Sequence, residues 1–68
     1  MRLSKRSFSL AGHRTSVALE QEFWDALADI AALRGVALSA LVADLDAERL
    51  PEQPLASTLR IFALRHRC

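Results

Sequence analysis

The stretch RTSVALEQEFWDALADIAALRGVALSALVADLDAERL, residues 14–50, decides the fold. Polar and apolar residues alternate over 14–19, with the period of two that a half-buried strand shows. A helix is expected over 20–35 and a second helix over 38–50, because apolar residues there recur with helical spacing. The pattern predicts a short strand, a helix, a turn and a second helix.

The ends of both helices carry their own signals. Phe23, Leu27 and Ile30 form one apolar stripe on the first helix. Gly35 follows this stripe and is expected to end the helix in the left-handed conformation. Pro51 lies just after the second stripe and cannot continue a helix. Both helices therefore present wide apolar faces that need a cover.

One strand and two helices do not enclose a core. A lone strand leaves backbone N–H and C=O groups unpaired along both edges, and a chain of 68 residues usually needs a staple or a partner. A second copy of the strand is the simplest remedy. We therefore expect an intertwined homodimer with an antiparallel ribbon across its two-fold axis. The residues expected in the dimer core are Val17, Leu19, Phe23, Trp24, Leu27, Ile30, Leu41, Val42 and Leu45.

The segments around this domain, which spans residues 7–50, have simpler patterns. Residues 1–6 read as a basic tail. Residues 7–19 alternate in polarity around Gly12, so they form a hairpin or one long strand, and we favour the hairpin. Residues 51–54 are a linker, and residues 55–68 are expected to form a C-terminal helix that packs on the domain. We find no internal repeat.

Charge is segregated along the chain although the net charge is only +1. Residues 1–19 carry +4, residues 20–54 carry −6 and residues 55–68 carry +3. A dimer would bring two basic N-terminal groups beside one ribbon, and such a surface attracts polyanions. Basic tails that merely keep the protein soluble explain the same charges.

Cysteine usage and hydropathy place the chain in a compartment. Cys68 is the one cysteine, which excludes an internal disulfide and fits a reducing, cytoplasmic setting. No apolar run approaches the roughly 20 residues of a membrane span. We expect a cytoplasmic protein without a membrane partner.

The strand, the helix, the glycine turn and the second helix resemble the ribbon-helix-helix DNA-binding proteins, such as the Arc and MetJ repressors. The resemblance rests on the alternating residues 14–19, on Phe23, Leu27 and Ile30, and on Gly35 followed by Leu38-Ser39-Ala40-Leu41-Val42. It implies a mostly α fold with a short β ribbon, to which the C-terminal helix expected from the apolar pattern after residue 54 is added. The stretch Gly12-His13-Arg14-Thr15-Ser16 is similar to small bacterial members of this family.

The resemblance also implies a mechanism. Two strands insert as an antiparallel ribbon into the major groove, where outward side chains meet base edges. By position these are Arg14, Ser16 and Ala18. The N-terminus of the second helix would hold a phosphate through free N–H groups. The residues expected to contact phosphate are Lys5, Arg6, Ala37, Leu38 and Ser39. Ala37 stands where many relatives have a capping Ser or Thr.

Other chemistry finds little support in the sequence. His13, His66 and Cys68 lack the spacing of a zinc site, and we expect no metal and no cofactor. No acid and histidine are placed to activate a nucleophile, so we do not expect an enzyme.

Two function classes remain. The first is a sequence-specific DNA-binding regulator of transcription. The second is a dimeric protein-interaction module, antitoxin-like or an adaptor, which binds a second protein through its acidic helices or residues 55–68. A strand over 8–10 that pairs beside the ribbon would broaden the sheet and hinder its insertion into the groove.

Overall fold

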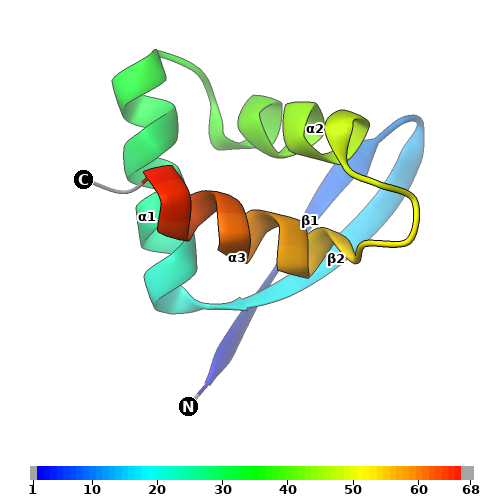
Figure 1. Cartoon of the computed structure of the whole chain (residues 1–68), viewed down its shortest axis with the longest axis horizontal. Coiled ribbons are helices and arrows are strands. Elements are labelled where there is room, and N and C mark those ends of the chain that lie inside the picture. Colours follow the sequence, from blue (N-terminus) through cyan, green and yellow to red (C-terminus); the bar gives the residue numbers. More distant parts are fainter. Residues whose placement is uncertain (1, 67–68) are drawn as a thin grey trace.

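A hairpin and three helices make up the chain (Figure 1). The structure is a computed structural model that describes residues 2–66. Its elements, in chain order, are β1 (Leu3–Leu10), β2 (His13–Glu20), α1 (Gln21–Arg34), α2 (Leu38–Glu48) and α3 (Leu55–His66). The expected architecture, a mostly α fold with a short β ribbon and an added C-terminal helix, is confirmed, while the intertwined homodimer stays a prediction.

The two strands pair with each other along their whole length. The antiparallel register runs from Leu3 opposite Glu20 to Leu10 opposite His13. Ala11 and Gly12 form the turn with φ angles of 52° and 81°, and two positive values are typical of a type I′ two-residue hairpin turn. The hairpin is thus formed, rather than one long strand.

The hairpin begins earlier than the sequence pattern indicated. Residues 3–6, which we had assigned to a basic tail, belong to β1. Trp24 explains this difference, because its Nε1–H donates a 2.8 Å hydrogen bond to the carbonyl oxygen of Ser4. The Arg6 guanidinium lies 5.2 Å from the centre of the Trp24 ring. A tertiary contact therefore holds a segment whose composition resembles a solvated tail.

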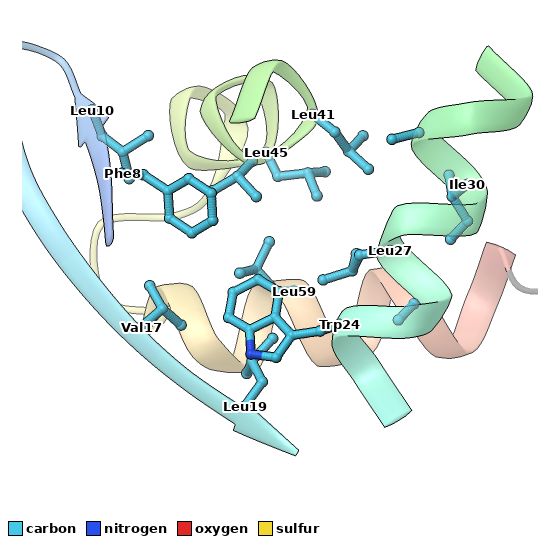
Figure 2. Packing of buried hydrophobic residues seen from close by; sticks show 13 residues of the cluster. Phe8, Leu10, Val17, Leu19, Trp24, Leu27, Ile30, Leu41, Leu45 and Leu59 are labelled. Carbon is cyan, nitrogen blue, oxygen red and sulfur yellow. The ribbon is translucent and has the colours of Figure 1, made fainter. Parts of the chain in front are cut away.

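The core lies between one face of the hairpin and the three helices. Phe8, Leu10, Val17 and Leu19 point from the strands toward α1, α2 and α3 (Figure 2). Phe8 and Trp24 lie with ring centres 5.9 Å apart at a tilt of 38°, an arrangement that aromatic pairs favour. The hairpin is thus one layer of a two-layer fold, with all helices on one side.

The residues expected in a dimer core are buried within one chain. Eight of those nine side chains are buried, and Phe23 is half-buried. From the sequence, a second subunit was expected to bury these side chains, because one strand and two helices do not enclose a core. In the structure β1 adds a strand, and α3 packs against α1, α2 and β2. One chain therefore encloses its own core.

Two arginines help to position α3 against the rest of the chain. Arg60 donates from Nε to Glu20 Oε1 at 3.0 Å, which joins α3 to the end of β2. Arg49 bonds Asp46 at 2.9 Å and donates from Nη1 to the carbonyl oxygen of Gln53, also at 2.9 Å. This second arginine shapes the connection between α2 and α3.

The helices are short compared with a membrane-spanning segment. Among the described residues no single helix is long and apolar enough to cross a membrane; α1 and α2, bent by 100° at the break between them, pass that test only as a pair.

The burial of α3 gives a first prediction. Leu59 is fully buried, whereas Leu64 on the same helix is 58% exposed. Leu59→Ala should lower the free energy of unfolding by about 2–5 kcal/mol because it leaves a cavity. Leu64→Ala should change it by no more than about 0.5 kcal/mol. Urea unfolding measures both, and equal effects would contradict the packing of α3.

The turn gives a second prediction. Ala11 holds a positive φ that Asn adopts more readily, and Asn-Gly is the preferred pair for this turn. Ala11→Asn should raise the free energy of unfolding by about 0.5–1 kcal/mol. Gly12→Ala should lower it by about 1 kcal/mol through backbone strain alone, since a Cβ there meets nothing within 4 Å. A thermal melt in which both variants match the wild type would show that this turn is not formed.

The Glu20–Arg60 pair gives a third prediction. A hydrogen bond from the backbone of Glu20, and then the bond from Arg60, hold the pKa of Glu20 below its ordinary value. A lowered pKa adds stability above the unfolded-chain pKa of about 4.3 and loses it as pH falls through the folded-state pKa. Glu20→Gln should thus melt below the wild type at pH 7, and the gap should narrow in acid. A gap that is independent of pH would refute this.

Candidate nucleic-acid interface

By strand alternation, four residue pairs of the hairpin lie on the side away from the core. One of them, Leu3 with Glu20, stands at the open end, where Glu20 bonds Arg60 of α3. The other three pairs make up the candidate surface. Residues directly opposite each other in an antiparallel pair share one face, and successive residues alternate between faces. Since Phe8 and Val17 face the core, the neighbouring positions face outward. The three pairs are Lys5 with Ala18, Ser7 with Ser16, and Ser9 with Arg14. We call these six residues the outer face.

The outer face is polar and carries two positive charges. Five of its six residues are exposed and Ala18 is half-buried. Ser7 Oγ and Ser16 Oγ lie 3.0 Å apart across the strands, which confirms that both side chains share this face. Lys5 and Arg14 occupy diagonally opposite corners. The six residues include no carboxylate, and the nearest one along β2, Glu20, is paired with Arg60. The face therefore suits a negatively charged ligand.

The three expected base-contact residues lie together on this face. Arg14, Ser16 and Ala18 follow one another along β2 at alternate positions. Arg14 is exposed, and within residues 2–66 it forms no ion pair with a carboxylate. Its guanidinium is therefore free to meet an external acceptor. The structure brings the three residues into the arrangement that the strand period predicts.

The structure separates Lys5 from Arg6. Both were expected to contact phosphate because they are neighbouring cations. Lys5 lies on the outer face opposite Ala18, whereas Arg6 lies opposite Val17 and covers the Trp24 ring. The separation follows from the alternation of side chains along a strand. The two cations therefore cannot act on one ligand surface in the same way.

The N-terminus of α2 lies away from the outer face. Ala37 is extended, makes no side-chain cap, and accepts hydrogen bonds at its carbonyl oxygen from the N–H groups of Ala40 and Leu41. Ser39 is exposed and Leu38 is half-buried. Figure 1 places this end of α2 next to the loop after α1, at the opposite end of α2 from the hairpin turn. A single chain does not bring these residues beside Arg14.

Two other surface features lie on the helices. A groove of about 690 Å³ runs along α1, lined by the acids Glu22, Asp25 and Asp29 together with Leu33. His66 stacks on Phe62 with ring centres 4.3 Å apart. Across residues 2–66 no three His, Cys, Asp or Glu side chains lie together as a metal ion would need. Cys68, a candidate ligand by residue type, lies outside the described residues.

Two residues of the outer face, Ser7 and Ser9, were missed from the sequence, which predicted a strand there without a role. Lys5 was expected to contact phosphate, but from a basic tail and not from a strand. The signal that could have found them is the likeness of residues 5–10 to residues 14–19. In both segments a cation comes first, a serine third and a leucine sixth.

Comparison with known proteins agrees with this geometry. Searches among curated proteins and among solved structures found no significant match. A family model described as the ribbon-helix-helix domain matches residues 3–67. That match covers the hairpin, all three helices and almost the whole chain. A two-stranded ribbon backed by helices is also what the structure shows. The chain belongs to the ribbon-helix-helix domain family.

Proposed function

We propose that this protein is a sequence-specific DNA-binding regulator of transcription in the cytoplasm, and that its hairpin inserts into the major groove with the outer face toward the bases. The family as a whole supports a DNA-binding or related role, and its domains are typically non-enzymatic. One observation carries the proposal. The hairpin has one face covered by helices, while its other face is polar, cationic and open. The major groove accepts a two-stranded ribbon of this kind.

Side-chain chemistry assigns a role to each β2 residue. Arg14 carries a forked guanidinium that fits O6 and N7 of guanine, the commonest specific contact in the major groove. Ser16 donates or accepts one hydrogen bond. Ala18 offers an apolar contact to a thymine methyl group. Arg14 is thus the residue on which base preference depends most strongly, because it makes two directed hydrogen bonds.

We propose phosphate contacts by residues that lie outside the outer face. The first N–H groups of a helix have no partner within it and bind anions, which suits the backbone of Ala37, Leu38 and Ser39. Because this end of α2 lies away from the outer face of its own chain, we propose that it meets DNA held by a second copy. Arg6 stands at the hairpin edge over Trp24, so its contribution to binding should be small.

We also propose a homodimer, but the second copy has a different role from the one predicted from the sequence. Proteins of this family typically form dimers. The sequence argument required a second copy to complete the ribbon, but one chain already pairs β1 with β2. A second copy would therefore add a second ribbon. Leu33 and Leu64, 74% and 58% exposed, are apolar side chains that such a contact would cover.

The acidic groove on α1 favours a second candidate function. Its three carboxylates and the exposed Leu33 would suit a basic amphipathic segment of another protein. The exposed residues of α3, including Ile61 and Leu64, extend the apolar surface available to a partner. In this reading the chain is a protein-interaction module that keeps the family's scaffold.

The role of Arg14 gives a fourth prediction. Arg14→Ala should weaken binding to the preferred duplex by about 1–3 kcal/mol and relax the preference at one base pair. Arg65→Ala removes the same charge from an exposed position on α3 and should leave the base preference unchanged. Binding of the three proteins to selected and scrambled duplexes, measured across a salt series, tests this.

The salt series also separates the two candidate functions. Contacts that only neutralise phosphate weaken with salt on every sequence alike. No binding at low salt, or equal binding to all duplexes regardless of Arg14, would contradict the regulator proposal. Either result would favour the protein-interaction module.

A further inference from the structure

The two strands of the hairpin carry the same short sequence pattern. Residues 5–10 read Lys-Arg-Ser-Phe-Ser-Leu and residues 14–19 read Arg-Thr-Ser-Val-Ala-Leu. Both have a cation, any residue, serine, an apolar residue, a small residue and leucine, and the two copies start nine residues apart. Only the serine and the leucine are identical in the two copies, so no repeat is evident from the sequence alone. Six residues are too short a unit to stand out before the strands are paired.

The register turns this repeat into local two-fold symmetry. Ser7 lies directly opposite Ser16, and a half-turn about an axis through this pair exchanges the two strands. The rotation places Lys5 on Arg14 and Ser9 on Ala18. On the core side it exchanges Phe8 with Val17 and Leu10 with Leu19, all of which are buried. The same two-fold axis therefore relates equivalent residues on both faces of the hairpin.

The serine pair marks that axis with a contact. The 3.0 Å hydrogen bond between Ser7 Oγ and Ser16 Oγ joins the strands where the axis passes. Each hydroxyl has two acceptor lone pairs and one proton, so the pair keeps hydrogen-bonding capacity toward a ligand. Measured along the strands, the positions of Lys5 and Arg14 are four residues apart, which is roughly 13 Å. That distance spans a few base pairs of DNA.

We propose that the outer face is a pseudo-two-fold-symmetric reading surface contained in one chain, which recognises a short, imperfect inverted repeat in double-stranded DNA. Lys5 and Arg14 are its equivalent base-reading cations, and the Ser7–Ser16 pair lies over the centre of the repeat. A symmetric protein surface matches a symmetric DNA site, and here the symmetry comes from a sequence repeat within one hairpin.

The two halves differ in ways that predict an unequal site. Arg14 forms a rigid fork, whereas Lys5 is a flexible point charge, so the half read by Arg14 is more strictly specified. Ala18 prefers a methyl group, while Ser9 offers a hydroxyl at the equivalent place. This inference rests on the proposed function, and it assigns Lys5 to base reading, where the sequence had assigned it to phosphate.

The test is site selection with the full chain on randomised duplexes, which also gives the fifth prediction. The wild type should select an imperfect inverted repeat and bind with one chain on each minimal repeat, so that the proposed dimer occupies two such repeats. Lys5→Ala should lower affinity by roughly 5- to 150-fold and relax the preference in one half only. Arg14→Ala should relax the mirror position. Lys5→Arg should make the two half-site preferences more alike.

Arg6→Ala is the matched control, because it removes the neighbouring charge from the opposite face of β1. It should keep the site preference. Circular dichroism and a thermal melt of each variant ensure that lost binding does not reflect unfolding.

The outcomes distinguish this inference from the proposed function. If no duplex is preferred by the wild type, both fail. If a site is preferred and depends on Arg14, but Lys5→Ala weakens all duplexes equally, only the symmetric reading fails. A stoichiometry of two chains for each minimal repeat would overturn it in the same way, because each chain would then read one half.

Discussion

Pairing of β1 with β2 within one chain is the interaction on which the rest of the structure depends. It satisfies the backbone groups along one edge of β2, places Phe8 and Leu10 beside Val17 over the helices, and leaves the alternate residues outside. Buried backbone polar groups must be paired, so a lone β2 would have required a partner chain. Because the hairpin meets this need locally, three helices suffice to close the core.

Trp24 connects this pairing to the helices. Its ring is fully buried between Phe8 and the covering guanidinium of Arg6, and its indole N–H bonds the backbone of Ser4. One side chain of α1 thereby fixes the first half of β1. The same contacts turn Arg6 toward the helices and leave Lys5 on the outer face. The composition of the candidate interface is thus a consequence of how the core is packed.

The position of the site agrees with its proposed chemistry. A ribbon that inserts into a groove needs one face anchored and the other free of bulky or acidic groups. The helices provide the anchor, and their acids lie on α1 and α2, apart from the outer face. Charge that looks nearly balanced over the whole chain is therefore separated in space. This separation supports DNA as the ligand of the hairpin and makes the acidic groove of α1 a distinct surface.

The sequence by itself determined the local elements and the faces of β2. Alternation over residues 14–19 and the apolar stripe on the first helix are local patterns, as is the stop at Gly35, and each fixes its element without help from distant residues. Tertiary structure alone decided that residues 3–6 join a strand, that the core closes within one chain, and that Lys5 lies opposite Ala18 on the face away from Arg6. These depend on Trp24 and on the strand register, contacts between residues far apart in the chain, which no local pattern specifies.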